Sequence, residues 1–142
     1  MKELNSLVFT QIRDNGTFQS LTGSTSSDPR IYYARTPVKH TVDNTKDSYA
    51  VFYLSGTTDP GNRIWNAGRN DHAYVVEVYS KKADTLSTLL QTLETLFRDQ
   101  QLETTSYYIG NTTAYQTAET FDETRNLFFG TLMVLFRTIW EK

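Results

Sequence analysis

The stretch from residue 127 to residue 140, LFFGTLMVLFRTIW, constrains the fold of this chain more than any other part of it. On a β-strand, its apolar side chains would occupy both faces, one with Phe128, Leu132, Val134, Phe136 and Trp140, the other with Leu127, Phe129, Met133, Leu135 and Ile139. A strand with one face in water alternates apolar and polar residues, so a strand that is apolar on both faces needs a cover on each. Burying five such side chains contributes about 7–15 kcal/mol, as much as the whole stability of a typical domain. We therefore predict that a neighbouring subunit or a folded-back segment covers the second face, with Met133 and Leu135 as candidate interface residues.

Length and composition indicate one domain over residues 1–142. The 14 basic and 16 acidic residues give a net charge of −2, which does not indicate a dedicated nucleic-acid binder. The absence of cysteine excludes disulfides and thiolate metal sites. Acids and amides interrupt the N-terminal segment where a signal peptide would be apolar, and no run reaches the length of a membrane helix. We expect a soluble chain that assembles in a cytoplasm, with no membrane partner.

Two segments have helical periodicity. Residues 2–13 carry Leu4, Val8 and Ile12 on one face, and Gly16 follows as a stop signal. A second helix is predicted from an N-cap at Asp84 to about residue 101. Its apolar stripe consists of Leu86, Leu89, Leu90, Leu93 and Phe97.

Five segments are predicted strands: residues 30–35, 48–54, 72–79, 105–117 (with a possible interruption at Gly110) and 127–140. The order is therefore α-β-β-β-α-β-β. Because one helix alone interrupts the strands, we expect a mostly antiparallel sheet of about five strands with both helices packed on it, in the α+β class.

The sequence contains few residues of the types that form catalytic or metal sites. His40 lies in a polar loop and His72 opens a strand, and neither has metal ligands at a suitable spacing. Asp122 and Glu123 lie in a turn, where carboxylates are usually solvated or act as caps. No phosphate-binding glycine loop or nucleophile elbow is present. We predict no catalytic, cofactor-binding or metal-binding site, and expect that the protein is not an enzyme.

The loop from residue 56 to residue 71 is the best functional candidate outside the closing stretch. Loops of this length are usually functional or disordered. It contains Arg63, Ile64, Trp65 and Arg69, and tryptophan and arginine are enriched among the residues that dominate the energy of protein interfaces. Two interpretations stay open: the loop contacts another protein, or Trp65 folds back onto the core while the arginines are solvated.

The arrangement resembles a known family. The early strand RIYYARTP, the strand SYAVFYL, the step VVEVYSKKADTLSTLLQTLETLF from strand to helix, and the long final strand are similar to those of the tail terminator (tail completion) proteins of long-tailed bacteriophages. The resemblance covers nearly the whole chain.

The resemblance implies a virion protein at the junction of head and tail, assembled in the host cytoplasm. Six copies would form a ring that ends tail-tube polymerisation and joins the tube to the head connector or completion protein. DNA would pass through the lumen without specific binding, and no cofactor is implied. Head-to-tail contacts in a ring require two different patches on each subunit. Three alternatives stay open: a head-completion or neck adaptor protein, a cellular small-molecule-binding α+β domain, and an enzyme built from His72, Asp122 and Glu123.

Overall fold

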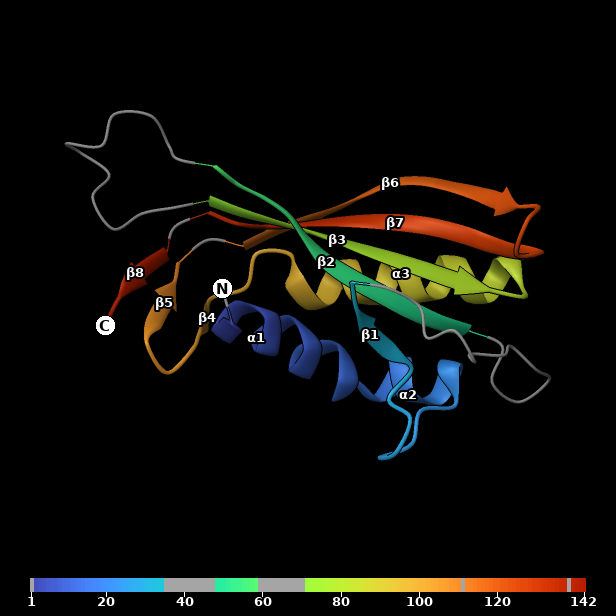
Figure 1. The fold of residues 1–142 in the computed structure, drawn as a ribbon, viewed down its shortest axis with the longest axis horizontal. Helices are drawn as coiled ribbons and strands as arrows, with labels where there is room; N and C mark the ends of the chain where they lie inside the picture. Colours follow the sequence, from blue (N-terminus) through green and yellow to red (C-terminus); the bar gives the residue numbers. More distant parts are fainter. Residues whose placement is uncertain (1, 35–47, 59–70, 111, 138) are drawn as a thin grey trace.

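The computed structural model describes residues 2–34, 48–58, 71–110, 112–137 and 139–142. Three helices and eight strands lie within these ranges (Figure 1). The helices are α1 (Lys2–Arg13), α2 (Gly16–Thr22) and α3 (Ala83–Phe97). The strands are β1 (Ile31–Tyr33), β2 (Ser48–Thr58), β3 (Asp71–Ser80), β4 (Leu102–Glu103), β5 (Tyr107–Ile109), β6 (Thr112–Asp122), β7 (Leu127–Phe136) and β8 (Ile139–Glu141).

Five strands form a large sheet in the order β1-β2-β3-β7-β6. The short β1 runs parallel to β2, and every other neighbouring pair in this sheet is antiparallel. A smaller sheet contains β4, β5 and β8 in that order. The predicted α+β class with a mostly antiparallel sheet is confirmed.

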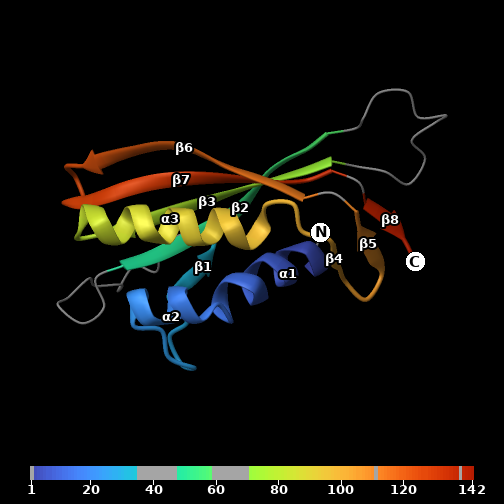
Figure 2. The same ribbon diagram turned by 180° about the vertical axis from the view of Figure 1, so that it is seen from behind.

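The helices cover one face of the large sheet (Figures 1 and 2). The α3 helix contacts β3, β6 and β7, while α1 contacts β1, β2 and α3. The predicted apolar stripes form the core: Leu4, Val8 and Ile12 of α1 are fully buried. They meet side chains of the strands that point towards the helices, including Phe52, Tyr74, Val76, Leu132, Val134 and Phe136.

The structure contains a helix, α2, that the sequence analysis does not predict. Gly16 does not end α1 but opens α2, because the side chain of Asn15 accepts a hydrogen bond from the Phe18 amide at 2.9 Å and caps the new helix. The helix ends at Gly23, whose φ of 70° lies in the left-handed region that suits glycine at a helix C-terminus. Phe18 thereby enters the core.

The predicted strand over residues 127–140 is wrong beyond Phe136. The chain leaves the large sheet there, and β8 pairs with β5 in the small sheet. Because of this break, the burial of the last two apolar residues, Ile139 and Trp140, is the reverse of what a continuous strand predicts. Ile139 is buried in the core, whereas Trp140 is 44% exposed.

Other predicted boundaries also change. The predicted strand over residues 105–117 is divided between β5 and β6, which belong to different sheets. The α3 helix ends at Phe97, short of residue 101, and Lys82 occupies the N-cap position predicted for Asp84. Asp84 lies instead in the first turn, where its negative charge suits the helix dipole.

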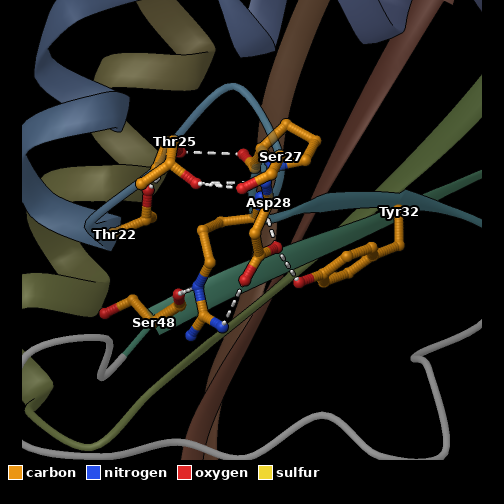
Figure 3. A network of polar contacts seen from close by, with 9 residues as sticks. Thr22, Thr25, Ser27, Asp28, Tyr32 and Ser48 are labelled. Atoms are coloured by element: carbon orange, nitrogen blue, oxygen red, sulfur yellow. Dashed lines mark hydrogen bonds and ion pairs between the residues drawn. The ribbon is translucent and has the colours of Figure 1, made fainter.

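A buried arginine fixes the short strand β1 against β2. The Nε atom of Arg30 donates to the Ser48 carbonyl at 3.1 Å, and its Nη1 lies 3.7 Å from Oδ2 of Asp28. Asp28 also accepts a hydrogen bond from the Tyr32 hydroxyl at 2.7 Å (Figure 3). Burial and the nearby Asp28 carboxylate raise the pKa of Tyr32. This network holds the Tyr32 ring on the side of the sheet away from the helices, 6.2 Å from the Tyr49 ring.

Candidate functional site: the outer face of the large sheet

The outer face is the face of the large sheet that points away from the helices. Strand pairing and the alternation of side chains place four cross-strand rows on it. These rows are Tyr49–Tyr79–Phe129–Thr120, Val51–Glu77–Thr131–Ala118, Tyr53–Val75–Met133–Tyr115 and Ala73–Leu135–Thr113. Most of these side chains are apolar or aromatic, although α1, α2 and α3 all lie on the opposite face.

At one end of the outer face, aromatic rings cover one another. Tyr49 and Tyr79 stack with their centroids 4.9 Å apart, and Phe129 lies 5.0 Å from Tyr79. Together with Val51 and Leu127, these rings form a second apolar cluster separate from the main core. Part of the second apolar face of β7 is therefore covered by the chain itself.

The other end of the outer face is more open. Met133 and Leu135, both predicted as interface residues, are half-buried there. Val75 and Tyr115 flank Met133 on the neighbouring strands, and Tyr115 is 47% exposed. Because no described helix packs over this end, its apolar side chains form a candidate interaction surface.

A carboxylate, Glu77, lies in the second of the four rows of the outer face. Its Oε1 accepts a hydrogen bond from the Tyr53 hydroxyl at 3.1 Å, and its Oε2 accepts one from the Tyr79 hydroxyl at 3.2 Å. Burial raises the pKa of both tyrosines, and the negative charge of Glu77 adds to the effect. Both hydroxyls therefore stay protonated at neutral pH and orient the Glu77 carboxylate.

The turn after β6 holds the acidic residues considered above for acid–base chemistry. Asp122 accepts hydrogen bonds from the Thr124 and Arg125 amides at 3.0 and 3.2 Å, and these bonds help to lower its pKa. The Arg125 guanidinium binds Asp122 at 3.0 Å and lies 5.0 Å from the centre of the Tyr79 ring. Asp122 thus acts as a turn cap, and Arg125 closes the aromatic end of the outer face.

A second exposed patch lies on the small sheet. Tyr108 and Trp140 are cross-strand partners with exposures of 53% and 44%, whereas Ile109 and Ile139 on the reverse face are buried. The Nζ atom of Lys142 lies 4.9 Å from the centre of the Tyr108 ring and 2.9 Å from Oε2 of Glu103. We call Tyr108, Trp140 and Lys142 the C-terminal patch. Sequence analysis missed it because it depends on the break after Phe136.

Most of the other residues considered in the sequence analysis fall outside the residues that the structure describes. Arg63, Ile64, Trp65 and Arg69 lie outside the described residues, as does His40. His72 is buried on the helix side of β3, with Phe136 as its cross-strand neighbour. The described ranges contain no group of three or more histidine, cysteine or acidic residues that could hold a metal ion.

A surface hollow between α1 and α3 bears on the small-molecule alternative. It has a volume of about 540 Å³ and is lined mainly by uncharged polar side chains, among them Gln11, Asn15, Thr88, Gln91 and Gln100. Small-molecule sites are typically lined by apolar and aromatic residues with a few polar groups. The lining of this hollow is instead mainly polar, which does not favour the small-molecule alternative.

None of the helices in the described ranges is both long and apolar enough to span a membrane.

Comparison with known proteins gives a likeness of fold. Neither a protein-family model nor a curated protein matches the sequence. Ten chains of solved structures match the fold, and one of them is a chain in the virion of a native gene transfer agent particle. The alignment covers 97% of this chain and 96% of that chain with a TM-score of 0.74 and 14% sequence identity. The two chains therefore share an architecture over nearly their whole lengths.

Proposed function

We propose that this protein is a non-enzymatic structural component of a phage-like virion, and specifically a tail terminator. The observation that carries the proposal is the fold shared with a chain of a gene transfer agent virion over 97% of this chain. The sequence resemblance to tail terminators points to the same kind of particle by a separate route.

In this role the chain forms a ring, for which the resemblance implies six copies. The ring ends the tail tube and joins it to the head connector or completion protein, with DNA passing through its lumen. The open end of the outer face supports assembly, because Met133, Leu135 and Tyr115 lie together there and are only partly covered. Residues 1–142 act as one domain, and the loop that contains Trp65 is a further candidate contact.

Deletion of the gene tests the role in the virion. Loss of a terminator leaves the tail tube free to polymerise, so the expected products are overlong tails with normal heads. Loss of a head-completion or neck adaptor protein gives heads that leak DNA and tails of normal length. Tails of normal length after deletion would contradict the terminator role, and complementation by the intact gene is the control.

A further inference from the structure

The outer face is a broad surface, and its open end keeps partly exposed side chains. Four of its strands contain 10 or 11 residues each. At about 3.3 Å per residue and about 4.8 Å between strands, these strands span about 600 Å². A stable protein interface buries about 800 Å² on each partner. Because the chain itself covers the aromatic end, the open end alone supplies less than this area, and a protein partner that docks there must bury further surface beside it.

The C-terminal patch has the character of an anchor for such an interface. Tyr108 and Trp140 lie side by side on β5 and β8, and both are about half exposed. Tryptophan and tyrosine are enriched among the residues that dominate binding energy. Ile109 and Ile139 attach the reverse of the small sheet to the core, so the two exposed rings are presented on a fixed support.

The two surfaces point in different directions on one molecule. The small sheet lies at one end of the chain's structure, near the start of α1, while the outer face lies across the large sheet from the helices (Figure 1). Tyr108, Trp140 and Tyr115 all keep substantial exposure within the single chain. The open end of the outer face and the C-terminal patch thus both keep exposed side chains.

Glu77 on the outer face and Lys142 in the C-terminal patch carry opposite charges. The cross-strand partners of Glu77, Val51 and Thr131, are uncharged. A carboxylate that becomes buried in an interface needs a cation, because an unpaired buried charge is strongly destabilising. Lys142 supplies one beside the Tyr108 ring, and its present pair with Glu103 is a surface pair of the kind that contributes little.

We propose, on the basis of the ring function above, that the C-terminal patch of one copy docks on the outer face of the next. Trp140 and Tyr108 cover the open end around Met133 and Tyr115, and Lys142 approaches Glu77. The contact is head-to-tail, because two different patches of the same chain meet. Repetition of such a contact closes a ring when its rotation fits a whole number of copies.

The test is a mixing experiment with two variants of the full chain. Tyr115→Glu adds a second negative charge to the outer face, and Trp140→Glu removes the aromatic anchor from the C-terminal patch. Both side chains are exposed, so the fold is retained, which circular dichroism verifies. Phe121→Ala, at an exposed aromatic residue outside both surfaces, is the matched control. Masses are measured by light scattering after size-exclusion chromatography, with and without tail tubes.

The head-to-tail contact predicts a specific pattern of masses. Each variant alone assembles at least about tenfold more weakly than the wild type, as expected for the loss of an interface anchor. An equimolar mixture forms dimers that do not grow, because each variant keeps one intact patch. Phe121→Ala assembles like the wild type.

Two results would overturn the inference while leaving the ring in place. In the first, Trp140→Glu assembles as the wild type does. In the second, the two folded variants stay monomeric when mixed although the wild type forms rings. A wild-type chain that stays monomeric with and without tubes would overturn the ring function itself.

Discussion

Leu90 of α3 packs directly on the backbone of Gly130 in the middle of β7, so that a Cβ atom on Gly130 would clash with the Leu90 side chain. Leu90 is fully buried and has little freedom to move. We expect Gly130→Ala to lower the free energy of unfolding by about 1–3 kcal/mol, as overpacking of a core does. Urea denaturation measures the change. Gly16→Ala is the control, because its Cβ would meet nothing within 4 Å; equal losses in both variants would contradict close packing of α3 on β7.

Met133→Lys separates assembly from folding. Met133 is half-buried on the outer face, so a lysine can extend its amine to solvent in the isolated chain. The expected cost in folding is about 1 kcal/mol, typical of single substitutions, whereas ring formation is lost because the charge would be buried at the interface. Sedimentation velocity reports assembly, and thermal denaturation reports folding. Thr95→Lys on the exposed side of α3 is the matched control. Normal assembly of Met133→Lys would show that this face is not an interface.

Exchanging charges tests the approach of Lys142 to Glu77. Glu77→Lys and Lys142→Glu each place like charges together and weaken assembly, and the double variant restores part of the loss. Double-mutant cycles of this kind measure the coupling between two groups. Assembly constants from light scattering give the result, with Lys81→Glu, at an exposed residue outside both surfaces, as the control. Additive losses in the double variant would place the two residues apart in the ring.

The tyrosines of the outer face predict a dependence of stability on alkaline pH. Burial raises the pKa of Tyr79 and Tyr53 above the unfolded value of about 10. The stabilisation from the protonated hydroxyls is therefore complete below about pH 10 and is lost as the pH rises through the folded pKa. Urea denaturation between about pH 9 and about pH 12 should show a falling free energy of unfolding. Tyr79→Phe should reduce the slope of the free energy of unfolding against pH, and an unchanged slope would contradict the prediction. Tyr108→Phe, which removes the hydroxyl of an exposed tyrosine, is the control.

Capping of α2 predicts a smaller effect. Asn15→Ala removes the acceptor for the Phe18 amide and should lower the free energy of unfolding by about 1 kcal/mol. Asn15→Asp keeps a side-chain oxygen in place and should be nearly neutral in a urea titration. If both substitutions cost the same, the side-chain cap does not stabilise the helix.

Long periodic segments could be predicted from the sequence because their signal is local. The bounds of α1 are those predicted, and the stripe from Leu86 to Phe97 is the buried face of α3. Alternation along β7 also places Met133 and Leu135 together on the face away from the helices. These features depend on the 3.6-residue and two-residue periods alone.

The parts of the fold that could not be predicted depend on long-range strand pairing or on residues that are common both at helix ends and at helix starts. Residues 127–140 contain neither proline nor glycine near Arg137, so no backbone breaker marks the end of β7, and Arg137 alone interrupts the apolar pattern of the second face. The small sheet joins strands of two or three residues from distant parts of the chain. Asn15 and Gly16 resemble a helix stop but serve as the cap and first residue of α2. The C-terminal patch follows from these features and was therefore missed.

Negative-stain electron microscopy of the purified wild-type chain, alone and with tail tubes, tests ring assembly most directly. We predict closed rings with countable subunits, found at one end of the tubes when tubes are present. Particles of monomer size under both conditions, from protein shown to be folded, would contradict the account.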